Sequence, residues 1–274
     1  MVQNLTFEIK DIANVPFYTE GPVIDKNGNR FVTNLAGGAI LKINADNTVT
    51  EWASAPCPNG QTITPNGNHL ICDVKSAAIK CYNQQGEFIR DEIQGFINGT
   101  EIYCPNDVIT DVQGNIYFTD SVRHKGKVCF VGINGEHKII ADQLDYPNGL
   151  VLVEEKNTLY VAESYTNRIL AIHLNKPAQV KVFCELPNHT SGKKEDNLPD
   201  GLALDTDGNI WVAHYGMGAV QVLSPNGKLL ATVETQIPLT SNLAFTNQNT
   251  LLVTGGYGEP GPGAIKEIKL YETY

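Results

Sequence analysis

Six polar residues stand at matching places in six similar segments of the chain, and together they have the chemistry of a metal site. These anchor residues are Glu20, Asn59, Asn106, Asn148, Asp200 and Ser241, spaced 39, 47, 42, 52 and 41 residues apart. Two of them are carboxylates, whose charges balance one divalent cation, and the asparagines add neutral amide oxygens. Oxygen ligands favour a hard ion, so we expect Ca²⁺ first, with Mg²⁺ or Mn²⁺ as alternatives. Zn²⁺ usually draws on His or Cys and is a further alternative.

Each anchor residue begins the same pattern of two strands joined by a turn. A short apolar run follows the anchor, then a turn rich in Asp, Asn and Gly, then a second strand rich in β-branched and aromatic residues, as in NDVITDVQGNIYFTD from Asn106. The turn residues suit a tight hairpin, and the second strands suit a half-buried pleated surface. A repeat of this size and pattern is typical of one propeller blade, and six blades close a ring.

We therefore expect an all-β fold: a six-bladed β-propeller with four-stranded antiparallel blades around a central channel, in a single domain spanning residues 1–274. The first strand of every blade lines the channel in such a ring, which would bring the anchor residues together. The terminal segments LTFEIKDI and AIKEIKLYETY are expected to share one blade and so close the ring. Closure would leave no long sheet edge exposed.

A second set of residues lies 14 or 15 positions after the anchors, at the ends of the second strands. These residues are Asn34, Asp73, Asp120, Glu163, His214 and Gly255. The constant offset predicts that they lie near the same channel, one strand further out. Asp120, Glu163 and His214 are candidates for substrate contacts or for orienting the metal ligands, and His214 could equally bond a neighbouring loop. Asn59 either contacts substrate or only closes the channel.

Four motifs resemble the senescence marker protein (regucalcin)/gluconolactonase family over residues 15–256: TEGPVID, CPNDVITDVQGNIYFTDS, YPNGLVL and LPDGLALDTDGNIWVAHYG. The resemblance implies a six-bladed propeller with a divalent metal on its axis, held by Glu20, Asn148 and Asp200. It places Asn106 beside the metal or substrate, in some members as a further ligand. Members are mostly sugar-lactone hydrolases, and a related branch of the diisopropyl fluorophosphatase type hydrolyses phosphorus esters.

The resemblance predicts a metal-dependent hydrolase that opens a small sugar-acid or hydroxyacid lactone. The metal would polarise the carbonyl, and a carboxylate would take a proton from the attacking water. The family assigns the equivalent of Asp200 a double role as ligand and proton acceptor, so Asp200 is our first choice of base, before His214, Glu163 and Asp120. Asn106 is the other catalytic candidate. A phosphotriesterase-like hydrolase and a non-catalytic calcium-binding scaffold stay open as alternatives.

One position departs from the family pattern. The regucalcin branch has a sugar-contacting arginine two residues before the third anchor, where this chain has Cys104. The change leaves the metal ligands intact but argues against gluconate-type specificity. We expect Cys104 and Cys57, which occupies the same place before the second anchor, to be small packing residues. Substrate choice is expected to depend on rim loops at residues 95–104, 121–127, 188–197 and 255–263.

The composition argues against several classes of partner. A net charge of −10 with scattered Lys and Arg disfavours nucleic acid. No apolar stretch is long enough for a signal peptide or a membrane span, and the six cysteines form no CxxC pair. We therefore expect a cytoplasmic protein with reduced thiols, a small-molecule lactone as its substrate and no obligate protein partner.

Overall fold

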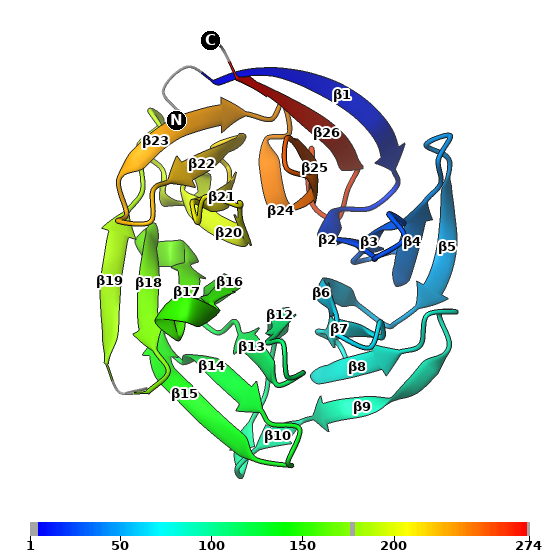
Figure 1. Cartoon of the computed structure of the whole chain (residues 1–274), viewed down its shortest axis with the longest axis vertical. Helices are drawn as coiled ribbons and strands as arrows, with labels where there is room; N and C mark the ends of the chain where they lie inside the picture. The colour runs from blue at the N-terminus through cyan, green and yellow to red at the C-terminus, as the bar shows by residue number, and fades with distance from the viewer. Residues whose placement is uncertain (1–4, 176–178, 273–274) are drawn as a thin grey trace.

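The computed structural model describes residues 5–175 and 179–272, whose strands form six four-stranded antiparallel sheets around a central axis (Figure 1). The predicted six-bladed propeller is thereby confirmed. From blade 1 to blade 6 the innermost strands are β2 (Thr19–Ile24), β6 (Pro58–Ile63), β12 (Pro105–Thr110), β16 (Pro147–Val153), β20 (Leu198–Leu204) and β24 (Leu239–Asn247). The second strands are β3 (Arg30–Asn34), β7 (His69–Asp73), β13 (Ile116–Asp120), β17 (Thr158–Glu163), β21 (Ile210–Tyr215) and β25 (Thr250–Gly256).

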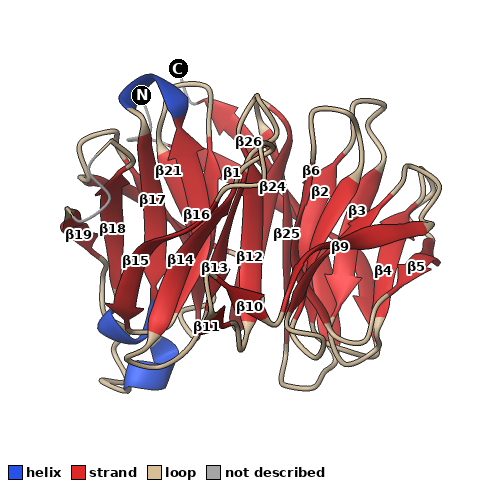
Figure 2. Cartoon of the chain, turned by 90° about the horizontal axis from the view of Figure 1, so that it is seen from below, coloured by secondary structure: helices blue, strands red, loops and turns tan. Residues whose placement is uncertain are grey.

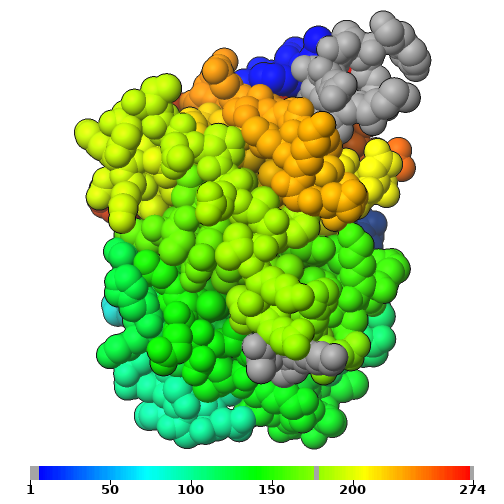
Figure 3. All heavy atoms as spheres, turned by 90° about the vertical axis from the view of Figure 1, so that its left-hand side faces the viewer, coloured from blue at the N-terminus to red at the C-terminus, as the bar shows by residue number. Residues whose placement is uncertain are grey.

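Two further strands complete each blade toward the outside. The third strands are β4 (Ala39–Ile43), β8 (Ala78–Tyr82), β14 (Gly126–Val131), β18 (Arg168–His173), β22 (Ala219–Leu223) and β26 (Gly263–Glu272). The outermost strands are β5 (Val49–Ser54), β9 (Phe88–Gln94), β15 (His137–Leu144), β19 (Val180–Glu185), β23 (Leu229–Glu234) and β1 (Leu5–Val15). Figure 3 views this outer wall from the side of blades 4 and 5.

The two ends of the chain share blade 6, as the sequence predicts. Strand β1 pairs antiparallel with β26, from Leu5 opposite Glu272 to Val15 opposite Gly263. The fourth strand of the last blade therefore comes from the beginning of the chain, and this pairing closes the ring (Figure 1).

In blades 1, 3 and 5, the turn between the first and second strands is held by an aspartate that caps its own loop. Asp25 Oδ1 accepts the backbone N–H groups of Asn27 and Asn29, both at 2.8 Å, and Gly28 follows the turn with φ of +80°. The same arrangement recurs at Asp111 and, with the same offsets, in blade 5. A short polar side chain and a residue that tolerates positive φ thus produce the hairpins.

The hydrophobic core lies between neighbouring blades. One cluster joins Leu70 and Ile79 of blade 2 to Phe118 and Cys129 of blade 3, and equivalent clusters join the other neighbours. Figure 2 shows the strands running between the two ends of the ring, where the loops lie with the short helices η1 (Glu154–Lys156), η2 (Ser164–Thr166) and η3 (Lys194–Asp196). Among the described helices, none has the length and apolar character needed to cross a membrane.

Candidate metal and catalytic site

The anchor residues lie near the starts of the innermost strands, at the end of the ring that we call the site face. All six are buried, with exposures between 0% for Ser241 and 9% for Asp200. In four blades the next residue is glycine, and the spacing leaves no room for anything larger. A Cβ on Gly149 would lie 2.3 Å from the Asp200 carbonyl oxygen and 2.5 Å from the Cα of Gly201. These glycines allow neighbouring inner strands to approach closely enough for the anchor side chains to gather.

Glu20 and Asp200 lie at this centre as buried carboxylates. Glu20 Oε2 accepts hydrogen bonds from the backbone N–H of Gly21 and from Asn242 Nδ2, the latter at 2.9 Å. Asn148, whose Nδ2 donates to Ser164 Oγ at 3.3 Å, lies beside Asp200. Burial raises the pKa of both carboxyl groups, and repulsion between them raises the pKa of Asp200 further.

A third carboxylate, Asp107, stands in the same group and was missed by the sequence reasoning. Burial raises its pKa to about 7, and its charge also raises the pKa values of Glu20 and Asp200. Asp107 and Asn242 occupy the position after the anchor that is glycine in the other four blades. That break in the glycine pattern is the signal that could have singled them out.

The donor chemistry of this group fits a hard divalent cation. The three carboxylates repel one another, and no cationic side chain among the described residues contributes to their pKa shifts. Among the same residues, no cluster of three or more His, Cys, Asp or Glu side chains could hold a metal by itself. The amide oxygens of Asn106 and Asn148 would therefore have to complete the ligand set, as calcium sites allow.

The other two anchors are placed differently. Ser241 Oγ donates to the Thr19 carbonyl at 2.9 Å and lies beside Thr254 Oγ1, so the hydroxyl bridges blades 6 and 1. Asn59 is the second residue of β6, beside blade 1, where its carbonyl oxygen would lie 2.8 Å from a Cβ on Gly21. Both residues are buried within the ring of inner strands.

Asp120, at the end of β13, is fully buried and bonded to the chain itself. Its Oδ1 accepts the backbone N–H groups of Tyr103 at 3.0 Å and Cys104 at 2.7 Å, and Oδ2 pairs with Lys127 Nζ at 2.7 Å. This carboxylate therefore holds the segment that leads into Asn106.

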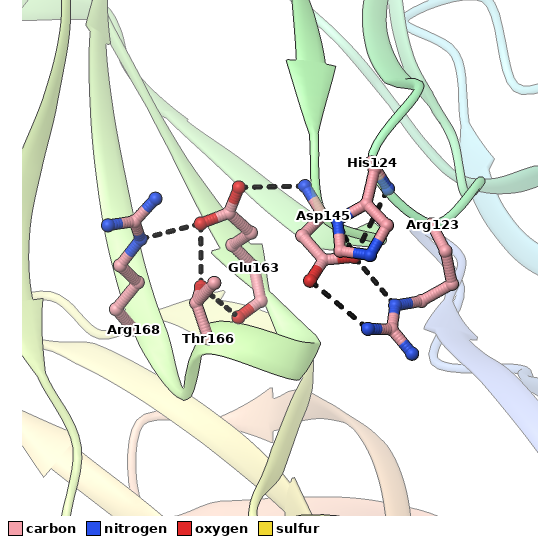
Figure 4. Close-up of polar contacts among 6 residues, drawn as sticks. All are labelled: Arg123, His124, Asp145, Glu163, Thr166 and Arg168. Carbon is pink, nitrogen blue, oxygen red and sulfur yellow. Dashed lines mark hydrogen bonds and ion pairs between the residues drawn. The ribbon is translucent and has the colours of Figure 1, made fainter.

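Glu163, at the end of β17, does the same for blade 4. Its Oε1 accepts the backbone N–H of Asp145 at 2.8 Å, and Oε2 accepts hydrogen bonds from Thr166 and Arg168 at 2.6 and 2.5 Å. Figure 4 shows this group beside a second ion pair, in which the Asp145 carboxylate binds Arg123 at 2.6 Å. These interactions tie the segment before Asn148 to the 121–127 loop and to the turn that follows β17.

The constant offset of this second set has a structural reason in three blades. In each, the residue that ends the second strand bonds the backbone three residues before the anchor; in blade 1, Asn34 Nδ2 donates to the Phe17 carbonyl at 2.7 Å. In blade 2 that backbone position is Pro56, which has no N–H. Asp73 instead accepts the Ser76 N–H at 2.9 Å, and its Oδ2 has no partner among the described residues.

His214 is enclosed in blade 5. The ring is 0% exposed, its Nδ1 lies 3.3 Å from Gln221 Nε2, and burial lowers its pKa to about 4. The imidazole is therefore neutral near pH 7. Asp120, Glu163 and His214 all make hydrogen bonds within the chain, and their role as substrate contacts stays a prediction.

Aromatic and acidic side chains surround the group on the site face. Tyr215 donates to Glu259 Oε1 at 2.8 Å, and the Tyr215 ring lies 6.3 Å from the ring of Tyr18. Glu259 belongs to the predicted rim loop 255–263, and its charge raises the pKa of the buried Asp200. By contrast, the 95–104 segment turns outward, where Asn98 donates to a carbonyl at the start of β15 (Figure 1).

Cys57 and Cys104 lie half-buried in blades 2 and 3 as free thiols. Burial raises the pKa of Cys57, and burial together with Asp120 raises that of Cys104 to about 11. Both side chains are therefore protonated near pH 7, which disfavours a nucleophilic role and fits the predicted packing role.

Comparison with known proteins identifies the family. The model of the SMP-30/gluconolactonase/LRE-like region matches residues 18–256. The chain belongs to this family. Within the SMP-30/gluconolactonase family, it is 30% identical over 230 residues to lactonase drp35 of Staphylococcus haemolyticus, covering 79% of this chain and 69% of that protein. It is also 30% identical over 261 residues to lactonase drp35 of Staphylococcus epidermidis, covering 85% and 78%.

Solved structures share the fold. The gluconolactonase XC5397 from Xanthomonas campestris has a TM-score of 0.82 and 24% identity, with 97% of this chain and 90% of that chain covered. A calcium-binding regucalcin from Agrobacterium tumefaciens has a TM-score of 0.75 and 18% identity, with 98% and 96% covered. At these identities the likeness concerns the propeller architecture alone.

Proposed function

We propose that this protein hydrolyses a small sugar-acid or hydroxyacid lactone and that a divalent cation, Ca²⁺ first, is held by Glu20, Asn106, Asn148 and Asp200. Membership of a lactonase family supports the reaction class. The observation that carries the metal proposal is the gathering of three buried carboxylates with raised pKa beside amide side chains. Mutual repulsion makes such a group unfavourable unless protons or a cation neutralise it.

A cation bound at the axis would supply positive charge that polarises the ester carbonyl of the lactone. Asp200 is the proposed proton acceptor for the attacking water, and Asn148 lies beside its carboxylate. Glu20 is fixed by Asn242 and by the N–H of Gly21, which suits a ligand that keeps its position. Asn106 is proposed to contact the lactone from the same centre.

The test begins with chelator-treated protein. Ca²⁺, Mg²⁺, Mn²⁺ or Zn²⁺ is added back separately, and acid release from a panel of lactones is followed with a pH indicator. We expect turnover that depends on the metal and is highest with Ca²⁺. Failure with every metal and every lactone would favour a binding function for the propeller.

Two variants test whether the reaction takes place at the axial site, by which we mean Glu20, Asn106, Asn148 and Asp200. Asp200→Ala should abolish both turnover and stabilisation by the metal, because it removes a ligand and the proposed base. Asp207→Asn is the matched control, since Asp207 is an exposed turn residue of the same blade, and it should retain both properties. A fully active Asp200→Ala protein would exclude the proposed mechanism.

A further inference from the structure

Tyr18 lies buried at the site face, two residues before Glu20. Its side chain is 5% exposed, and a Cβ on Gly256 would come within 2.9 Å of the Tyr18 Cδ2 atom. The ring therefore lies against Gly256 of blade 6, where a larger residue would not fit. It packs toward the ring of Tyr215 of blade 5. The Tyr18 backbone N–H donates to the Pro260 carbonyl at 2.8 Å, which fixes the residue under the 255–263 loop.

The Tyr18 hydroxyl is buried and has no hydrogen-bond partner among the described residues. Other tyrosines show the usual arrangement: Tyr82 donates to the Ser54 carbonyl and Tyr215 to Glu259, both at 2.8 Å. A buried donor without a partner is unfavourable, because it has lost its hydrogen bonds to water without replacement. Phenylalanine would fill the same space without this penalty.

The charges of the buried carboxylates at the axis act on the Tyr18 hydroxyl. Burial and then the charges of Asp200 and Glu20 raise the Tyr18 pKa well above its usual value. A phenol carries its proton near pH 7, so the Tyr18 hydroxyl can act as a hydrogen-bond donor. Thr19 alone separates Tyr18 from Glu20, and the Tyr18 ring lies 6.3 Å from that of Tyr215, whose hydroxyl donates to Glu259 in the 255–263 loop.

We propose that Tyr18 is a catalytic residue whose hydroxyl donates a hydrogen bond to the lactone oxygen that gains negative charge during hydrolysis. The proposal rests on the lactonase function proposed above. A fixed donor aimed at a developing oxyanion needs no rearrangement during the reaction, and it is worth most where water is excluded. The bound lactone would then supply the acceptor that the Tyr18 hydroxyl lacks in the free protein.

The experiment compares Tyr18→Phe with Tyr82→Phe in the full chain. Losing one oxyanion donor should lower the kcat of Tyr18→Phe by about 10²–10³-fold, with KM changed only a few-fold. The same substitution should raise Tm of the metal-free protein by about 2–4 °C, since it removes an unpaired buried polar group. Tyr82→Phe loses the satisfied hydrogen bond from the third strand of blade 2 to the Ser54 carbonyl, so its Tm should fall while its kcat stays at the wild-type value.

The results separate this role from the general function. If the wild-type protein hydrolyses lactones and Tyr18→Phe does so equally fast, the catalytic role of Tyr18 is refuted while the lactonase function stands. A Tyr18→Phe protein with lower Tm and lower kcat would also refute it, because the hydroxyl would then be a structural partner. A wild-type protein that opens no lactone refutes the proposed function and the Tyr18 role together.

Discussion

In the absence of the proposed metal, the free energy of unfolding of this protein should fall as the pH rises from 5 to 7. Glu20, Asp107 and Asp200 all have raised pKa values in the folded state. The folded chain therefore holds these protons more tightly than the unfolded chain does. The resulting stabilisation is complete below the unfolded pKa values near 4, and it is lost as the pH rises through the folded values.

Asp107 alone sets the scale of the effect. Its pKa rises from 3.8 to about 7. At about 1.4 kcal/mol for each pH unit, this group can contribute at most about 3 kcal/mol between pH 5 and pH 7. A chain of this length changes Tm by about 2 °C per kcal/mol, so the expected loss is about 5 °C from Asp107.

Thermal unfolding in chelator measures this loss, with Asp107→Asn as the reference. His69 and His214 act in the opposite direction, because burial lowers each pKa to about 4 and so adds stability as the pH rises toward 6.5. Subtracting the Asp107→Asn curve from the wild-type curve cancels these histidines. We expect the wild type to lose about 5 °C relative to the variant between pH 5 and 7, and saturating Ca²⁺ to abolish the loss.

Two results would refute the reasoning. Parallel wild-type and Asp107→Asn curves in chelator would show that Asp107 does not titrate abnormally in the folded chain. A wild type that gains stability relative to the variant as the pH rises would show that a cationic neighbour, absent from the interactions described for the group, already neutralises it.

Three further predictions concern the architecture of the site. Glu20→Gln should lower lactone turnover at least about 10²-fold and abolish stabilisation by Ca²⁺, because it removes a proposed ligand; unchanged Ca²⁺ binding in a titration would contradict this. Gly149→Ala should lower the free energy of unfolding by about 1–3 kcal/mol and weaken Ca²⁺ binding, because its Cβ would overlap the backbone at Asp200; urea unfolding with wild-type stability would argue against it. Lys127→Met should cost about 3–5 kcal/mol in urea unfolding, since it leaves Asp120 buried without its cation, and an unchanged midpoint would be the opposing result.

The repeat pattern by itself predicted the blades, the closure and the place of the anchor residues on the innermost strands. These features are local or periodic: a turn such as Asp25–Asn29 caps itself, and paired strands with short apolar runs repeat at a blade-sized interval. Closure followed from the strand patterns at the two ends of the chain, because the last blade has four strands only when the first strand of the chain is added to it.

Only the tertiary structure decided which polar side chains share an environment. In the sequence, Asp107 follows an anchor much as a turn aspartate would, and Tyr18 is one aromatic residue among many. Burial, repulsion from Glu20 and Asp200, and the absence of a described partner for the Tyr18 hydroxyl depend on groups from other blades. Electrostatic and hydrogen-bonding energies act through space, so residues hundreds of positions apart determine them, and no local pattern encodes that distance.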